Sequence, residues 1–388
     1  MHSTARLSVR PVTADSIVER DVAAWSALED RALEPNAYLS PYFVLPAIRR
    51  LAPRTSPAIV FVERSAAGRT ELLAVGVFVE AAPNVHTPVR RLATHWSKYA
   101  PLGGLLLHRD HAVQAFGALL DYVKQTAPDC KLIELAPVWN DGPMTGADGI
   151  IARCCGVEPV AVDTVPRAIL VLSKCQSYLE SRLLSQRIRD LGRRMRRLRE
   201  RGEVSWHCHW RNGVPAAAIE SLLALEHMGW KGTAHSSLRS HPADEAFFRE
   251  MIAGFASERR AVLTELTLDG TPIACSSNLL SGKTGFAFKI GWHPDFRTFS
   301  PGWINELEFM QRAPAEFPGC DYFDSGARPD SFINELWPDR RALSTLLVPT
   351  QLSGRVAIAA LTPLRRLKRR LTRISTLLPH VAWTRKPA

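Results

Sequence analysis

Residues 285–302 have the sequence GFAFKIGWHPDFRTFSPG, in which an apolar strand, a polar loop and the start of a helix follow one another. The apolar run that ends at Trp292 is typical of a buried strand. Ser300 and Pro301 predict a helix start, because serine caps helix ends and proline suits the first helical position. Free backbone N–H groups and the positive end of the helix dipole make such a start a predicted phosphate site, to which Arg297 adds a cation. An ordinary strand–helix connection is the simpler alternative.

Residues 225–232, with the sequence LEHMGWKG, end a predicted helix in a Trp-Lys pair between two glycines. Glu226 is a candidate general base, provided that its surroundings raise its pKa. Lys231 is a candidate partner for an anionic group. The alternative is a plain helix C-terminus, in which Gly229 is the cap and Lys231 complements the helix dipole.

A third polar segment begins at the end of the predicted strand Cys320–Asp324. It has the sequence DSGARPD from Asp324 to Asp330, and LWPDRR follows at residues 336–341. A carboxylate at a strand end, in a loop with glycine and proline, is often functional and as often part of a turn. Trp337 and Arg340 either close over a ligand or anchor the loop.

The residues around these motifs predict a mixed domain of helices and strands. Apolar runs separated by the turns Asp269-Gly270 and Ser281-Gly282-Lys283 indicate a three-stranded meander. Before it, apolar residues spaced four, three, four and three apart predict a long amphipathic helix, with eight arginines between Arg187 and Arg201. The other elements predicted in residues 166–350 are strands at 168–172 and 204–210 and helices at 215–227, 247–257 and 303–313.

Residues 1–165 also alternate helices and strands, which suggests an α/β or α+β unit. The predicted elements are helices at 22–33 and 111–126, a hairpin of strands at 58–63 and 72–80, and a strand at 131–136. The hairpin and the later meander share one order, in which a hydrophobic strand, a glycine turn and a longer apolar strand follow one another. This similarity is a weak indication of an internal duplication.

The three polar segments, together with Ala32–Asn36 and Tyr99–Gly103, resemble in kind and order the GNAT-type acetyltransferase-like family of CelD-like proteins. That family is similar in fold to Fem-type peptidyl transferases, which carry two GNAT-like units. The resemblance implies an α/β (α+β) fold of tandem GNAT-like units, with mixed, mostly antiparallel sheets flanked by helices. It implies a degenerate GNAT-like unit at residues 1–165, a GNAT acyltransferase domain at 166–350 and a basic tail helix at 351–388.

The resemblance implies N-acyl transfer, in which an amine attacks the thioester carbonyl of acetyl-CoA or another acyl-CoA directly. The pantetheine arm would lie where the sheet splays between Gly285–Trp292 and Cys320–Asp324. Glu226 is the first candidate for the general base and Asp324 the second. Expected cofactor-binding residues are Lys289, Ile290 and Gly291 at the oxyanion and Arg297, Ser300 and Gly302 at the pyrophosphate; expected substrate-binding residues are Trp230, Lys231, Trp337 and Arg340. Ser300 departs from the family pattern, which has glycine there.

The positive charge of the chain lies in its last part. The formal net charge is +11, and residues 340–388 contain eleven Lys or Arg and no Asp or Glu. Residues 362–374 predict a basic amphipathic helix within this tail. Its predicted partner is an anionic membrane surface or an acyl carrier protein, unless the helix simply packs on the body of the protein. No secretory leader or membrane-spanning run is evident, so we expect a cytoplasmic protein. A peripheral position on the inner face of the membrane is the alternative.

Two other classes of function stay open. One is a Fem-like transferase that uses aminoacyl-tRNA, in which the Arg187–Arg201 helix and the tail would bind the phosphates of the tRNA. Nucleic acid is disfavoured, because this helix contains no aromatic residue on which bases would stack. The other class is a non-catalytic accessory protein of polysaccharide biosynthesis. No metal is expected, because His207 and His209 share a strand face but no second ligand pair lies at a useful spacing.

Overall fold

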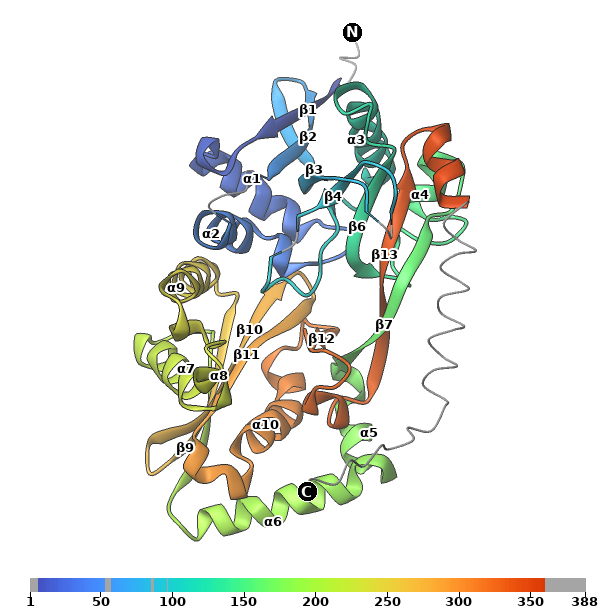
Figure 1. Cartoon of the computed structure of the whole chain (residues 1–388). Helices are drawn as coiled ribbons and strands as arrows, with labels where there is room; N and C mark the ends of the chain where they lie inside the picture. The colour runs from blue at the N-terminus through green and yellow to red at the C-terminus, as the bar shows by residue number, and fades with distance from the viewer. Residues whose placement is uncertain (1–5, 53–56, 85–86, 96, 360–388) are drawn as a thin grey trace, which may run out of the picture.

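One continuous sheet runs through the protein. The structure is a computed structural model that describes residues 6–52, 57–84, 87–95 and 97–359. Within these residues thirteen strands form the sheet, in the order β1-β2-β3-β4-β6-β13-β7-β12-β11-β10-β9-β8, with β5 paired to β3. Figure 1 shows the N-terminal and C-terminal halves at opposite ends of the molecule, with β7 and β13 running between them.

The bounds of the elements follow chain order. The strands are β1 (Arg6–Val12), β2 (Ala58–Ala66), β3 (Arg69–Ala81), β4 (Arg91–Thr94), β5 (Leu106–Leu107), β6 (Leu132–Trp139), β7 (Val160–Val171), β8 (Val204–His209), β9 (Ala261–Leu268), β10 (Thr271–Ser281), β11 (Thr284–Trp292), β12 (Tyr322–Asp324) and β13 (Asp339–Pro349). The α-helices are α1 (Glu19–Asp30), α2 (Pro41–Leu51), α3 (Ala112–Thr126), α4 (Ile150–Cys155), α5 (Cys175–Glu180), α6 (Arg182–Arg199), α7 (Ala216–Met228), α8 (Trp230–Thr233), α9 (Pro242–Ser257) and α10 (Pro301–Glu316). Short 3-10 helices include η5 (Pro294–Phe299) and η6 (Phe332–Glu335).

The two halves repeat one order of elements. A strand, two or three helices and three strands are followed by a crossover helix and a further strand, from β1 to β6 and again from β8 to β12, and the first half has the two-residue strand β5 in addition. The strands that the crossover helix connects are parallel, namely β4 with β6 and β11 with β12, and the other neighbours are antiparallel. The predicted tandem, mostly antiparallel α/β fold is therefore confirmed.

The strand that follows each half lies in the other half. β7 follows the first half along the chain but pairs with β12, and β13 follows β12 but pairs with β6. β7 and β13 also pair with each other, which joins both halves into one sheet. The predicted division at residues 165 and 166 falls inside β7 and stays a prediction.

The predicted amphipathic arginine helix is α6. Its side chains Leu184, Leu191, Met195 and Leu198 are buried, as the apolar spacing predicts. Most of its arginines are exposed. Ser181 caps the helix by accepting the N–H of Leu184 at 3.4 Å.

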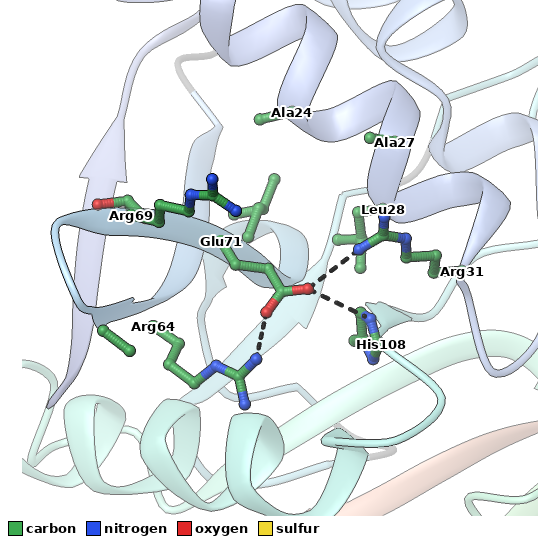
Figure 2. A pocket seen from close by; sticks show the side chains of 11 residues that line it. Ala24, Ala27, Leu28, Arg31, Arg64, Arg69, Glu71 and His108 are labelled. Carbon is green, nitrogen blue, oxygen red and sulfur yellow. Dashed lines mark hydrogen bonds and ion pairs between the residues drawn. The ribbon is translucent and has the colours of Figure 1, made fainter. Parts of the chain in front are cut away.

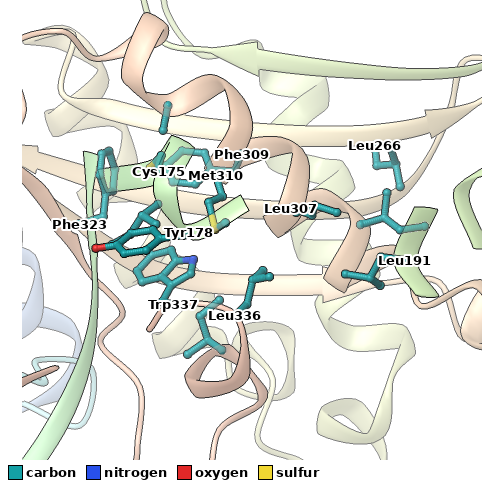
Figure 3. Close-up of a cluster of buried hydrophobic side chains, with 14 of the residues drawn as sticks. Cys175, Tyr178, Leu191, Leu266, Leu307, Phe309, Met310, Phe323, Leu336 and Trp337 are labelled. Atoms are coloured by element: carbon teal, nitrogen blue, oxygen red, sulfur yellow. The ribbon is translucent and has the colours of Figure 1, made fainter. Parts of the chain in front are cut away.

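A large apolar cluster fills the space between α5, α6, α10 and the sheet (Figure 3). Trp337 is fully buried in it, together with Leu336, Tyr178 and Met310. Truncating a buried tryptophan costs about 3–5 kcal/mol in typical cores. The segment between β12 and β13 is thus held firmly against the C-terminal half.

Some elements are absent from the sequence prediction, namely β1, α2, β4, α4 and β13. α2 is hard to predict because Pro46 lies inside it. Its residues are also apolar on nearly all sides, so their spacing gives little indication of a helix. β7 begins at Val160, earlier than the predicted strand at 168–172. The prediction misses this start because the middle of β7 is exposed and contains Asp163 and Pro166.

The predicted tail helix at 362–374 lies outside the described residues. None of the helices in the described part of the chain is long and apolar enough to cross a membrane.

We expect the exchange of β7 and β13 to make the halves interdependent. A chain cut after Glu180 would give fragments 1–180 and 181–388, which should co-purify when they are coexpressed. Each fragment alone should fail to melt cooperatively by circular dichroism, because a sheet edge that the other fragment covers is left bare. A cooperative melt of either fragment alone would contradict this expectation.

Candidate active site

The strands β11 and β12 part after three paired residues. Their parallel pairing joins Thr284–Phe286 to Tyr322–Asp324, and from Ala287 onward no described strand covers this edge of β11. On its other edge β11 contains a bulge at Phe288, because Ser277 pairs with Lys289 while Asn278 pairs with Ala287. A bulge bends a strand and redirects its side chains. The predicted splay between these two strands is present.

A cavity of about 210 Å³ opens where the strands part. The backbone segments 287–290 of β11 and 325–327 after β12 form two of its walls. Lys231 of α8 and Glu306 of α10 also line it. Ala274 packs in the cluster that contains α10 residues, whereas Cys275 packs with α7, so these helices cover opposite faces of the sheet. The cavity therefore draws its lining from both faces.

Glu226 lies on α7 and its side chain is fully buried. Its Oε1 atom pairs with the ammonium groups of Lys231 at 3.3 Å and Lys289 at 3.4 Å. Its Oε2 atom accepts the N–H of Leu238 at 2.7 Å. Glu226 is not among the cavity-lining residues, whereas both lysines are. This arrangement suits the positioning of two lysines, and the general-base role of Glu226 stays a prediction.

The two lysines give the cavity a cationic side. Lys231 Nζ donates to the carbonyl of Ile290 at 3.0 Å, and Lys289 Nζ lies 4.4 Å from the ring centroid of Tyr99. Burial lowers the pKa of Lys289, and the charge of Glu226 opposes that shift. The backbone N–H of Lys289 donates to Ser277 Oγ at 3.2 Å. Two ammonium groups beside a bare strand edge can stabilise negative charge that develops there.

Gly291 brings α7 close to β11. A Cβ atom at this position would lie 2.4 Å from the backbone nitrogen of Glu226. Because Gly291 has no side chain, α7 can approach β11 closely enough for Glu226 to pair with Lys289. Trp230 begins α8. The ligand contacts expected of Ile290, Gly291 and Trp230 stay predictions.

Asp324 is tied into the fold. Its carboxylate is 3.4 Å from Arg167 Nη1 and accepts the N–H of Gly326 at 3.0 Å. Arg167 also donates to the carbonyl of Pro101 at 3.2 Å. Burial raises the pKa of Asp324, and the charge of Arg167 opposes that shift. Asp324 is absent from the cavity lining, so its position suits the joining of β12, β7 and the loop near Pro101.

The start of α10 adjoins the cavity. A Cβ atom on Gly302 would lie 3.5 Å from the side chain of Ile290, which lines the cavity. Ser300 adopts the left-handed conformation with φ of 55°, and its hydroxyl accepts from Arg194 Nη1 at 2.5 Å. Arg297 is exposed in η5. The helix start thus carries Arg194, a cation from α6 that the sequence does not predict.

The segment between β12 and β13 supplies a further wall. Trp337 lines the cavity, and its indole N–H has no hydrogen-bond partner among the described residues. Arg340 is exposed and donates to the carbonyls of Asn334 at 2.6 Å, Asp339 at 2.8 Å and Trp337. Trp337 thus lines the cavity and Arg340 bonds to its own loop, while the ligand contacts expected of both stay predictions.

Glu306 is a candidate that the sequence patterns miss. It lies on α10, lines the cavity, and has no ion-pair partner among the described residues. Burial raises its pKa to about 7, and a hydrogen bond with Ser276 opposes that shift. Of the residues that line this cavity, Glu306 is the only acid. The sequence signal is a polar pair, Asn305-Glu306, among the otherwise apolar buried residues of α10.

A polar network supports Glu306 from behind. Asn305 Nδ2 donates to Thr264 Oγ1 at 2.9 Å and to Ser276 Oγ at 3.2 Å, and the two hydroxyls are 2.8 Å apart. Trp206 Nε1 donates to Asn305 Oδ1 at 3.0 Å, which fixes the orientation of the amide. Ser276 thus joins this network to Glu306, with whose carboxyl it also forms a hydrogen bond.

The first half contributes to the site through residues in or next to the two segments that carry the family resemblance. Tyr38, two residues after Asn36, donates its hydroxyl proton to the carbonyl of Ala287 at 3.2 Å. Tyr99 stacks on Phe247 with ring centroids 5.5 Å apart and faces Lys289. Lys98 pairs with the buried Asp244 at 2.6 Å. Both segments therefore fix the bare end of β11.

No group of three or more His, Cys, Asp or Glu side chains in the described part of the chain is placed to hold a metal ion. The strand histidine His209 pairs with Glu265 at 2.7 Å.

The chain is similar to several solved structures. The C-terminal domain (DUF2156) of a proposed lysylphosphatidylglycerol synthetase from Agrobacterium fabrum is 11% identical, with a TM-score of 0.52 over 88% of this chain and 94% of that chain. FemX is 11% identical, with a TM-score of 0.53 over 88% of this chain and 97% of that chain. A tandem GNAT protein from the clavulanic acid biosynthesis pathway is 15% identical, with a TM-score of 0.41 over 89% and 99%. No curated protein sequence matches the chain.

At this identity the likeness to the DUF2156 domain and to FemX shows a shared fold. In sequence, residues 185–332 match the family model of the acetyltransferase (GNAT) domain. This match contains most of α6, the meander β9–β11, the bulge and the whole of α10. Residues 185–332 are therefore similar in sequence to GNAT acetyltransferase domains.

Proposed function

We propose that the protein is an N-acyltransferase that moves an acyl group from a coenzyme A thioester to an amine. The observation that carries the proposal is the cavity at the parting of β11 and β12, which adjoins the start of α10. An extended pantetheine arm needs backbone partners along its length, and the edge of β11 beyond Phe286 has no strand partner in the described part of the chain.

The start of α10 suits the diphosphate of the donor. A 16-residue helix carries a partial positive charge at its first turn. Ser300 and Trp303 already donate their N–H groups to the carbonyls of Arg297 and Ser300. The side chains of Arg194 and Arg297 therefore supply the charge that this turn needs, because few of its own amides are available.

Trp337 and Glu306 support a polar ligand inside the cavity. A buried N–H without a partner costs about 1–3 kcal/mol. The indole N–H of Trp337 is such a group, and the carboxyl of Glu306 has no cation beside it. A pantetheine arm has amide groups that can satisfy either of them.

Glu306 is the proton acceptor in this mechanism. The substrate ammonium gives a proton to its carboxylate, and the neutral amine then attacks the thioester carbonyl. The C–N bond forms and the C–S bond breaks, while Lys231, Lys289 and the predicted backbone donors at Ile290 and Gly291 stabilise the oxyanion. The thiolate leaves as the thiol when it takes up the proton that the attacking nitrogen loses. A pKa near 7 suits a group that must both accept and return a proton.

A Fem-like aminoacyl-tRNA donor is the second candidate. Two observations favour it, namely the fold shared with FemX and the exposed arginines on α6 beside the start of α10. The acyl group would then leave an oxygen ester, and α6 would contact phosphates along the RNA. The predicted membrane or acyl-carrier partner of the tail stays a prediction, because residues 360–388 lie outside the described part of the chain.

Thermal-shift measurements with coenzyme A, acetyl-CoA and tRNA separate the classes. A ligand at one hundred times its dissociation constant adds about 2.7 kcal/mol of stability, so a bound coenzyme should raise the Tm by several degrees. A rise with tRNA alone would favour the aminoacyl donor. No rise with any ligand would contradict enzymatic function and favour the accessory protein.

Replacing Arg194 tests the diphosphate site. We expect Arg194→Ala to weaken acetyl-CoA binding about tenfold in titration calorimetry, because the variant loses a cation that contacts Ser300. The matched control is Arg193→Ala, whose guanidinium pairs with the same Asp190 but is 65% exposed. Equal affinities of the two variants would remove Arg194 from the donor site.

Replacing Glu306 tests the proton acceptor. The wild-type kcat/KM for thiol release should rise with pH through about 7, as the carboxyl ionises. Glu306→Gln should lower kcat and remove this rise. Glu308→Gln on the same helix, where Glu308 pairs with Arg312, is the control. A pH rise that survives in Glu306→Gln would assign the proton to another group.

The same variant has a readout that needs no acceptor. Because the pKa of Glu306 is raised in the folded state, the wild type loses stability as pH rises from about 4.5 to about 7. At 1.36 kcal/mol for each pKa unit, the loss is about 3 kcal/mol. Glu306→Gln should therefore have a higher free energy of unfolding than the wild type at pH 8, and the gain should vanish at pH 4. An equal difference at both pH values would contradict the raised pKa.

A further inference from the structure

The first half contains a cavity of its own, of about 490 Å³ (Figure 2). It lies between α1, the turn of the β2–β3 hairpin and His108. These elements are at the opposite end of the molecule from α6 and α10 (Figure 1). The cavity therefore has no part in the proposed acyl transfer.

Positive charge dominates the lining of this cavity. Three guanidinium groups line it, from Arg31, Arg64 and Arg69, against the single carboxylate of Glu71. Formal charges thus leave an excess of two. Burial lowers the pKa of His108, which keeps its imidazole neutral near pH 7.

Glu71 holds the neighbouring cations in one place. Its carboxylate pairs with Arg31 at 3.1 Å, contacts Arg64, and lies 3.6 Å from His108 Nε2. Arg64 is also 2.9 Å from His111 Nε2. Figure 2 shows these groups converging on Glu71 from α1, β2 and the loop after β5. The ion pairs with Glu71 therefore direct the guanidinium groups of Arg31 and Arg64 toward the same place, although the side chain of Arg31 is 60% exposed.

The side chain of Arg69 has no hydrogen-bond or ion-pair partner among the described residues. It lies directly after the hairpin turn and lines the same cavity. Figure 2 shows its guanidinium directed toward the space beside Glu71 and α1. A guanidinium presents a planar set of donors that matches carboxylate and phosphate oxygens. The lining thus contains a cation whose donors are available to a ligand.

The opposite wall is apolar and small. Ala24 and Ala27 of α1 are exposed to the cavity, while Leu28 and Leu72 lie buried beneath. Side chains at positions three apart share a helix face, so the two alanines leave room where larger residues would fill the space. The cavity volume falls in the range of about 300–1,000 Å³ that small-molecule sites have.

We propose that this cavity is a second binding site, which takes a small dianion with an apolar part, such as a phosphate monoester. The doubly negative group would sit against Arg31, Arg64 and Arg69, where it balances the excess charge. The apolar part would lie over Ala24 and Ala27. A bidentate contact with a planar guanidinium is among the stronger interactions that a phosphate makes.

Titration calorimetry on the full chain tests this site with phenyl phosphate and inorganic phosphate. Arg194→Ala serves as the background, so that binding at the start of α10 does not interfere. Phenyl phosphate should bind at one site and more tightly than inorganic phosphate, because of the apolar wall. Adding Arg69→Ala should weaken binding about tenfold. Adding Ala27→Phe should abolish it by filling the space, without removing a charge.

Two control variants keep the test specific. Ala23→Phe puts the same side chain on the same helix at an exposed position outside the cavity, and Arg90→Ala removes an exposed arginine of the same half. Both should bind phenyl phosphate as the background does. The proposal is wrong if Arg69→Ala and Ala27→Phe behave like these controls, or if the background binds neither anion. None of these results depends on whether the protein transfers an acyl group.

Discussion

The parting of β11 from β12 is the constraint on which the rest of the structure depends. Gly326 follows β12 with a φ of +60°, and a Cβ atom there would lie 2.8 Å from the carbonyl oxygen of Ala287. The chain therefore touches β11 at Ala287 and then turns away, while the bulge at Phe288 bends β11 in its turn. A bare strand edge beside a cavity results, and the start of α10 adjoins it.

The two halves differ at the place where the strands part, although they share one order of elements. In the first half the corresponding gap beyond the β4–β6 pairing is nearly closed, with a cavity of about 20 Å³ where Leu102 and Gly103 pack beside Trp139. The same loop reaches the second half, where Tyr99 faces Lys289. Arg167, which holds Asp324, comes from the exchanged strand β7. The first half thus supports the open cavity of the second.

Much of the second half was open to prediction, because its elements have strong local signals. The apolar spacing of α6, the glycine turns of the meander and the Ser300-Pro301 helix start all correspond to structure. Roles that depend on contacts distant in sequence were not predictable. Glu226 is predicted as a base from its own segment, which does not reveal that two lysines pair with its carboxylate, one of them 63 residues away at position 289. The sequence gives little indication of Glu306, because its raised pKa depends on burial and on the lack of an ion-pair partner among the described residues. Strand exchange leaves no local pattern at all.

A crystal structure with acetyl-CoA tests the central claim most directly. The account predicts that the pantetheine arm lies along β11 from Ala287 to Ile290, opposite Ser325–Ala327, with the diphosphate at Gly302 and Arg194 and the acetyl carbonyl beside Lys231 and Lys289. Coenzyme density elsewhere, with this cavity still empty, would contradict it.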